Sequence, residues 1–172
     1  MSDANNLPAA DQSAAAPIKS VAAQAVELIK ERFPDAIEEI KEQHGEVSLY
    51  VKRDRLVELC RYLRDDPKLQ FNLLSDLTGV DWGLEASPRF EVVYQLRSLP
   101  HRLRLRLKVR VDEEQCHVPT ITPVWQTANW HERETFDLFG IRFDGHPDLR
   151  KILTPEDLEG HPLRKDFPLR GY

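Results

Sequence analysis

Residues 90–111, FEVVYQLRSLPHRLRLRLKVRV, carry the strongest β-strand pattern in the chain. In its second half apolar and basic residues alternate strictly, so all the apolar side chains of a strand would point to one face. The first half, from Phe90 to Leu96, alternates in the same way with more polar positions between. Residues 98–101, SLPH, separate the halves and are typical of a turn. The pattern predicts an antiparallel hairpin with one buried face.

The other face of the second strand carries five basic side chains at a spacing of roughly 7 Å, which follows from the strand rise. Our first interpretation is a solvated face, partly neutralised by neighbours such as Glu91. The second is a surface that meets an acidic protein partner, and the third is a nucleic-acid surface. No aromatic side chains alternate with the cations on their face, as binders of single strands require. The five are Arg102, Arg104, Arg106, Lys108 and Arg110.

Two helices are expected before the hairpin. The first has apolar residues at helical spacing over 21–29, a possible cap at Ser20, and an end near Phe33 because Pro34 follows. The second would begin at Asp54 as the N-cap and stop at residues 65–67, DDP. Its apolar stripe is formed by Leu56, Val57, Leu59, Cys60 and Leu63.

The remaining elements upstream are strands. Residues 36–41 and 47–51 predict two short strands around the sequence QHGE at 43–46, with the cleaner alternation in the second. Residues 71–82 are ambiguous, because their apolar residues fit either a strand or a buried helical turn and Gly79 weakens both.

Composition indicates one globular domain: 172 residues, 41% hydrophobic and 31% charged. The net charge of −5 argues against a dedicated nucleic-acid binder. No apolar run approaches the ~18 residues of a membrane span. Residues 1–17 lack the pattern of a secretory signal and are expected to be a flexible leader. Cys60 and Cys116 have no metal-ligand spacing, and a cluster would need about four ligands, so we expect structural thiols.

The second informative stretch is ANWHERETFDLFGIRFDGHPDLRKIL, residues 128–153. Asn129 is a favourable N-cap, and Glu132 three residues later completes a capping-box pattern. Gly140 follows Phe139 at the position where a helix needs a left-handed residue. These signals predict a helix of about three turns.

On a helical wheel Glu132 falls within the apolar arc, whereas Arg133, Glu134 and Asp137 project from the other side. A carboxylate on an apolar face is costly unless something pairs with it. We therefore expect Glu132 to cap its own helix, to meet an arginine, or both. The apolar arc is formed by Ala128, Thr135, Phe136, Leu138 and Phe139.

The acids of this helix do not match an enzyme site. They point in different directions, and no nucleophile motif accompanies them. His131 and Glu132 begin like the zinc motif HExxH, but Thr135 occupies the position of its second histidine. His146 and His161 are interpreted as loop histidines, and no glycine-rich phosphate loop is present. A structural role is thus favoured over proton transfer.

Residues 144–172 are expected to form an extended C-terminal arm. They contain prolines at 147, 155, 162 and 168 and too few apolar residues to fold alone, yet those residues recur at intervals. Such a segment either is disordered or lies along another surface, and the spacing favours the second. The predicted organisation is a leader (1–17), an α+β domain (18–143) and this arm. The domain would hold a small mixed or antiparallel β-sheet with flanking helices.

ERETFDLFG at 132–140, followed by GHPDLRKIL at 145–153, resembles the signature of the 30-kDa subunit family of respiratory complex I. PLRKDFP at 162–168 resembles that family's tail, and the likeness covers the chain from about residue 20, most sharply from Val118. The resemblance implies structural or interface roles, and no catalytic, metal or cofactor role, for Glu132, Arg133, Glu134, Asp137, Gly140, His146, Pro147, Arg150, Arg164 and Lys165.

The resemblance also implies a cofactor-free subunit in the peripheral arm of proton-translocating NADH-quinone oxidoreductase, with the isolated chain not catalytic. FMN, iron–sulfur clusters and quinone would lie on partner subunits, chiefly the 49-kDa-like D subunit and the cluster-bearing B and I subunits. Such a complex places the chain peripherally on the cytoplasmic side of the cell inner membrane. The alternative is the equivalent subunit of a membrane-bound, complex I-like hydrogenase. A basic-strand nucleic-acid module is a distant third, and a hydrolase using Glu132 and Glu134 has the least support.

Overall fold

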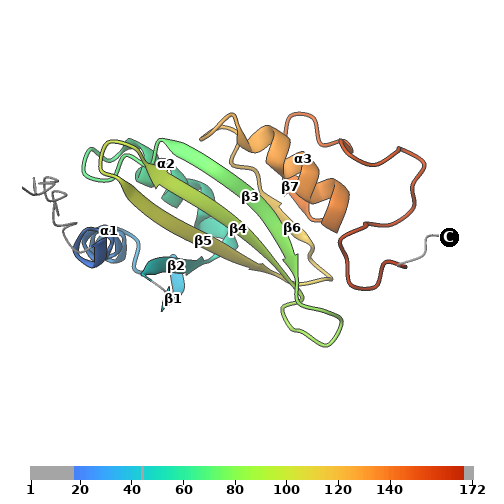
Figure 1. Ribbon diagram of the computed structural model, residues 1–172, viewed down its shortest axis with the longest axis horizontal. Coiled ribbons are helices and arrows are strands. Elements are labelled where there is room, and N and C mark those ends of the chain that lie inside the picture. The colour runs from blue at the N-terminus through green and yellow to red at the C-terminus, as the bar shows by residue number, and fades with distance from the viewer. Residues whose placement is uncertain (1–17, 44, 169–172) are drawn as a thin grey trace, which may run out of the picture.

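The computed structural model describes residues 18–43 and 45–168, with side chains described from residue 25 onward. The predicted leader, residues 1–17, lies outside these ranges. A five-stranded sheet forms the centre of the described part, and Figure 1 shows helix α2 behind this sheet and helix α3 beside its β3 edge. The α+β class predicted from the sequence is confirmed.

The strand order of the sheet is β1-β2-β5-β4-β3. Neighbouring strands are antiparallel except β2 and β5, which are parallel. The predicted hairpin is confirmed, with β4 and β5 in unbroken register from Phe90 opposite Val111 to Ser98 opposite Leu103. The two short strands upstream are confirmed as well. The strands are β1 (Ile37–Gln43), β2 (Glu46–Val51), β3 (Leu73–Asp81), β4 (Phe90–Ser98) and β5 (Leu103–Val111).

Helix α1 spans Ile18–Arg32, so it begins two residues before Ser20 and ends next to Phe33 as expected. Helix α2 spans Leu56–Asp65 and ends where the DDP sequence begins. Both helices contribute to one hydrophobic core with the apolar face of the sheet. Residues of the two helices in this core include Ala25, Val26, Ile29, Leu56, Leu59, Cys60 and Leu63.

The expected N-cap of α2 at Asp54 is wrong. Asp54 is exposed within a short 3₁₀ turn, Arg53–Arg55, and the residue before α2 is Arg55, which makes no side-chain cap. The Arg53 guanidinium holds this turn by donating to the carbonyls of Gln115 and His117, each at 3.2 Å. This long-range contact adds a turn that the local sequence does not signal.

The ambiguous segment 71–82 forms the edge strand β3. Gly79 fits there because α3 packs directly on this strand. A Cβ atom at Gly79 would lie 2.8 Å from Cδ2 of Phe139, closer than side chains approach each other. The glycine that weakened the prediction therefore makes room for the helix.

Helix α3 (Ala128–Phe139) connects two short parallel strands, β6 (His117–Pro119) and β7 (Arg142–Asp144). Residues 145–168 contain no helix or strand. This arm nevertheless returns to the domain, because the Leu163 N–H donates to the carbonyl of Leu138 at 3.0 Å. Figure 1 shows it looping around α3.

The second face of the hairpin is more covered than predicted. Glu91 and Val93 on β4 are only 6% and 7% exposed although they share the face of the basic side chains. Lys108 Nζ lies 2.9 Å from Glu91, which confirms the expected neutralisation by that neighbour. Arg102 does not belong to this face, since it lies in the turn with a φ of 55°.

Candidate functional site: the charged helix and the C-terminal arm

Glu132 is fully buried, but neither expected partner is present. The helix begins one residue before Asn129, so the capping-box geometry does not form, and the cap residue Thr127 makes no side-chain hydrogen bond. Glu132 reaches the preceding loop instead: Oε1 accepts from the Ile121 N–H at 2.8 Å and Oε2 from the Thr120 hydroxyl at 2.5 Å. Burial raises the pKa of Glu132 to about 7, against the lowering effect of these two hydrogen bonds.

The buried imidazole of His146 lies beside this carboxyl group. Its Nδ1 accepts the Asp148 N–H at 3.0 Å, so the proton belongs on Nε2, which donates to the carbonyl of Asn129 at 3.2 Å. The distance from Nε2 to Glu132 Oε2 is 3.9 Å, too long for a hydrogen bond. His146 therefore anchors the start of the arm to the start of α3.

Asp137 lies on the side of α3 opposite the apolar arc, and it is buried there. Its Oδ2 accepts three consecutive backbone N–H groups, those of Ile152, Leu153 and Thr154, at 2.8–3.0 Å. Its Oδ1 accepts the Thr154 hydroxyl at 2.5 Å. Burial would raise the pKa of Asp137, but these hydrogen bonds outweigh burial and lower it to about 2.

Arg133 is also buried, because the arm packs over it. Its guanidinium donates at 3.2 Å to the carbonyls of Arg150 and Lys151 and lies 5.3 Å from the ring centre of Trp130. Arg133 and Asp137 are buried on the side opposite the apolar arc because α3 has two covered sides. The sheet covers one, and the arm covers the other by hydrogen-bonding to both residues.

Gly140 ends α3 with a φ of 72°, as predicted for a left-handed residue. A side chain here would also be blocked by the arm: a Cβ atom would lie 2.4 Å from His161 Nε2 and 2.7 Å from Arg164 Nη2. Arg164 Nε donates to the carbonyl of Phe139 at 2.6 Å, and His161 Nδ1 lies 2.8 Å from the carbonyl of Asp137. The missing side chain thus lets the arm approach the unpaired carbonyls of the helix end.

A buried ionic cluster beside the arm was missed by sequence reasoning. Arg89 is 2% exposed and contacts Asp81 at 2.9 Å, Asp166 at 2.8 Å and Glu113 at 2.6 Å. The backbone N–H of Lys165 donates to Asp81 as well. Burial would raise the pKa of Asp81, but the hydrogen bonds, first that from Arg89, lower it to about 2. No short motif signals the cluster, since its members come from the β3–β4 turn, from Glu113 and from the arm.

The remaining predicted residues lie at the surface. Glu134, Pro147, Arg150 and Lys165 are exposed. The Arg150 side chain pairs with Asp148 at 2.9 Å, while its carbonyl accepts Arg133. Pro147 lines an open hollow of about 620 Å³ together with Trp130 on α3. The packing of the arm on α3 therefore brings together Arg133, Asp137, Gly140, His146, Arg150 and Arg164, whereas Glu132 is bound to the preceding loop and Lys165 to Asp81.

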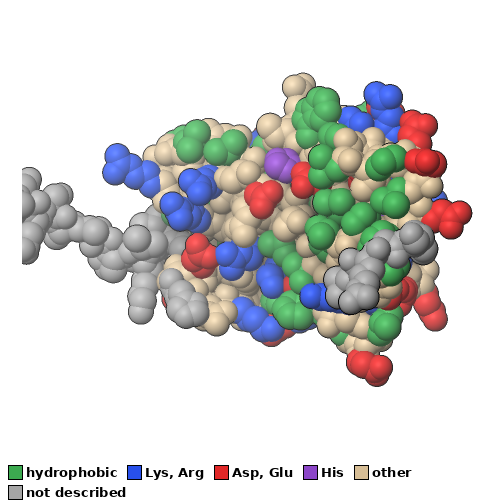
Figure 2. All heavy atoms as spheres, turned by 45° about the vertical axis from the view of Figure 1, so that its right-hand side comes forward, with side chains coloured by type: hydrophobic (Ala, Val, Ile, Leu, Met, Phe, Trp, Pro, Cys, Tyr) green, Lys and Arg blue, Asp and Glu red, His purple; other side chains and the backbone are tan. Residues whose placement is uncertain are grey.

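Five exposed large apolar side chains lie on α3, on the arm and in the loop after β3. Trp130 on α3 is 62% exposed, and Leu153 and Leu163 on the arm are 62% and 50% exposed. Trp82 and Leu84 are exposed in the loop after β3, which the Lys165–Asp81 hydrogen bond joins to the arm. Figure 2 shows the hydrophobic side chains gathered here. We call these five residues the arm surface.

Within residues 18–43 and 45–168, no group of three or more His, Cys, Asp and Glu side chains is placed to hold a metal ion. Burial raises the pKa of the thiol of Cys60, as expected for a packed cysteine. None of the described helices is long and apolar enough to cross a membrane. Asp137 on α3 and His146 and His161 on the arm instead hold the arm against the helix.

The fold and this site define a small α+β module in which a charged helix fixes a wrapped C-terminal segment. Residues 49–172 match the family model described as the 30-kDa subunit of respiratory-chain NADH dehydrogenase. The chain belongs to this family, and the resemblance seen in the sequence is confirmed.

Similar proteins and solved structures support the same family assignment. The chain is 56% identical over 144 residues to the C 2 subunit of NADH-quinone oxidoreductase from Rhizobium etli, covering 84% of this chain and 76% of that protein. It is 48% identical over 148 residues to the C subunit of the same enzyme from Geobacter sulfurreducens, covering 86% and 90%. A solved fragment of Nqo5 has 34% identity and a TM-score of 0.62 over 75% of this chain and 99% of that chain. A chain of an archaeal membrane-bound sulfane sulfur reductase has 26% identity and a TM-score of 0.72, covering 86% and 85%.

Proposed function

We propose that this chain is a structural docking subunit of the peripheral arm of a proton-translocating NADH-quinone oxidoreductase and binds no redox cofactor itself. One observation carries the proposal. The buried or half-buried charged residues of the signature have partners within the chain, while the arm surface on α3, the arm and the neighbouring loop is exposed. A catalytic site would require polar groups that converge on an accessible pocket.

The partners follow from the family. The arm surface would dock on the 49-kDa-like D subunit and the cluster-bearing B and I subunits, which with the rest of the complex would carry FMN, iron–sulfur clusters and quinone. The chain would then lie on the cytoplasmic side of the inner membrane, held there through the complex. The division into a domain, residues 18–143, and a docking arm, residues 144–172, belongs to this proposal. So do the structural or interface roles of the ten signature residues.

The arm residues have two functions in this proposal. Their inner side is bound by Asp137, Arg133 and the end of α3, so the arm's backbone is already ordered. A preordered surface loses less conformational freedom on binding than a disordered tail would. Leu153 illustrates the arrangement, because its N–H is bound to Asp137 while its side chain points to solvent.

Co-purification tests the proposal. An affinity-tagged chain, expressed in cells that make the complex and recovered from detergent-solubilised membranes, should bring flavin and iron–sulfur absorbance with it. Recovery as a free monomer in the same preparation would contradict it.

A second candidate is the equivalent subunit of a related membrane-bound assembly such as a hydrogenase. The likeness to a chain of a membrane-bound sulfane sulfur reductase supports it, since the same fold occurs in another respiratory membrane complex. Metal analysis of the purified material discriminates between the two. A nickel-containing subunit in place of the flavin-bearing one would favour the hydrogenase-type assembly.

A further inference from the structure

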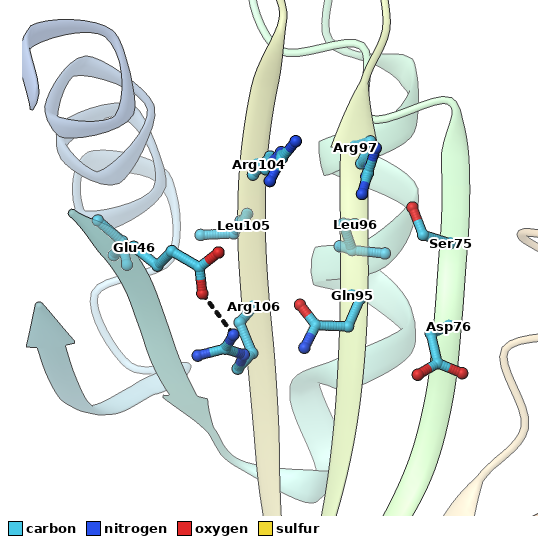
Figure 3. A pocket seen from close by; sticks show the side chains of 10 residues that line it. Glu46, Ser75, Asp76, Gln95, Leu96, Arg97, Arg104, Leu105 and Arg106 are labelled. Carbon is cyan, nitrogen blue, oxygen red and sulfur yellow. Dashed lines mark hydrogen bonds and ion pairs between the residues drawn. The ribbon is translucent and has the colours of Figure 1, made fainter. Parts of the chain in front are cut away.

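The sheet face turned away from α2 carries a hollow of about 500 Å³ that the arm does not reach. It crosses β2, β5, β4 and β3, and Figure 3 shows its polar side chains rising from these strands. Six of its lining residues are charged or carry a hydroxyl group: Glu46, Ser75, Asp76, Arg97, Arg104 and Arg106.

Two of these arginines are without an acidic partner among the residues that the structure describes. Arg97 on β4 stands directly opposite Arg104 on β5, and both are exposed. Farther along the same face every cation is matched, for example Arg106 with Glu46 at 2.5 Å and Lys108 with Glu91. Like charges directly across a strand pair destabilise it, so an anion bound between Arg97 and Arg104 would remove a repulsion.

Nearby acids do not supply that anion. Glu46 is bound to Arg106, and Asp76 faces His131 with 3.7 Å between Oδ1 and Nδ1. In Figure 3 both carboxylates lie at the sides of the hollow, while Arg97 and Arg104 stand together at one end.

A third donor lies beside Arg97, on the side away from Arg104. Ser75 occupies an irregularity in β3, where the register with β4 shifts between Leu74 and Asp76. Its hydroxyl oxygen is buried and makes no hydrogen bond within the described residues. Figure 3 shows this hydroxyl turned toward Arg97. A buried hydroxyl without a partner is uncommon and needs an explanation, which a bound acceptor would supply.

We propose that this hollow is a docking site for an acidic segment of a partner protein, with carboxylates pairing with Arg97 and Arg104. Guanidinium groups bind carboxylates through paired, charge-assisted hydrogen bonds. A protein segment fits better than nucleic acid, because no aromatic side chain lines the hollow for bases to stack on. The site is independent of the arm surface, so this proposal and the proposed function can fail separately.

Peptide binding to the isolated full-length chain tests the proposal. The probe is a capped hexaglutamate peptide, titrated by calorimetry at low ionic strength. Saturable one-site binding is expected, and Arg97→Gln with Arg104→Gln should weaken it by roughly tenfold or more. The matched control removes the same charge elsewhere, by Arg61→Gln with Lys68→Gln, both exposed residues outside the hollow. This control should bind nearly as the unchanged chain does.

Four results would overturn the proposal. These are no saturable binding, an equal loss in the control pair, tighter binding of an oligonucleotide of equal charge, and displacement of the peptide by equimolar inorganic phosphate. The last two would assign the hollow to nucleic acid or to a small anion. Thermal unfolding separates misfolding from lost binding, because removing opposed like charges should leave the Tm unchanged or higher. If the double variant does unfold, Arg104→Gln alone should weaken peptide binding, and unchanged binding would overturn the proposal.

Discussion

Replacing Glu132 by glutamine should remove a pH dependence from the stability of this protein. Glutamine has the shape of the protonated acid, can accept the Ile121 N–H, and can donate to the Thr120 hydroxyl oxygen. That oxygen has a further partner in the Thr122 hydroxyl at 3.0 Å. The substitution therefore leaves the buried hydrogen bonds in place and removes only the ability to ionise.

The size of the effect follows from the pKa of Glu132, which the fold raises from 4.5 to about 7. Between these values the folded protein holds a proton that the unfolded chain releases, so the free energy of unfolding falls as the pH rises. At 1.36 kcal/mol per pH unit, the loss between pH 4.5 and pH 8 is about 3 kcal/mol. Glu132→Gln should lose none of this contribution and should be the more stable protein at pH 8.

Urea denaturation followed by tryptophan fluorescence at several pH values measures this difference. Trp125 is a suitable reporter, since it is buried and its indole N–H donates to the carbonyl of Phe71 at 3.1 Å. Glu134→Gln is the matched control on the same helix, because Glu134 is exposed, and its profile should follow that of the unchanged protein. Parallel pH profiles for the unchanged protein and Glu132→Gln would show that ionisation of Glu132 does not cause the loss of stability at high pH.

Three further predictions concern the packing of the arm. Asp137→Asn should lower the free energy of unfolding by about 2 kcal/mol at pH 7, because the fold lowers the pKa of Asp137 from 3.8 to about 2. This loss should disappear as the pH falls through that range, and a loss of the same size at pH 2 would contradict the prediction. Arg89→Met should cost about 3–5 kcal/mol by leaving Asp81 buried and unpaired, and adding Asp81→Asn should restore part of the loss, as chemical denaturation can show. Gly140→Ala should destabilise the fold more than Gly45→Ala and expose the arm to limited proteolysis. Both glycines have a positive φ, but only Gly140 is contacted by the arm; equal costs would argue against that contact.

The parts of the fold that the sequence predicts are those set by local periodicity. The alternation at 103–111 determines the hairpin, and Gly140 at the end of α3 has the conformation that its position requires. Strand β3 stayed ambiguous because Gly79 is explained only by Phe139, a residue far along the chain. Local patterns could not show which segments would meet.

In the candidate site, too, local patterns predict the elements, whereas distant contacts determine where the side chains point. The capping-box pattern around Glu132 is present, but the buried N–H of Ile121 and the hydroxyl of Thr120 determine where its carboxylate points. A helical wheel places Arg133 and Asp137 opposite the apolar arc, but it does not show that the arm covers this second side of the helix. Arg89 has no local signal, because its acidic partners are brought to it by the strand turn and the arm.

The proposed function requires that α3 and the arm dock a partner subunit and perform no chemistry. This requirement can be tested by measuring the rate of NADH oxidation per bound flavin together with the amount of assembled complex. Leu153→Gln with Leu163→Gln should reduce assembly and leave the rate per flavin unchanged. Leu99→Gln, at a residue similarly exposed but in the β4–β5 turn, should change neither. If the double variant assembled fully but had a reduced rate per flavin, this would contradict a purely docking role for α3 and the arm.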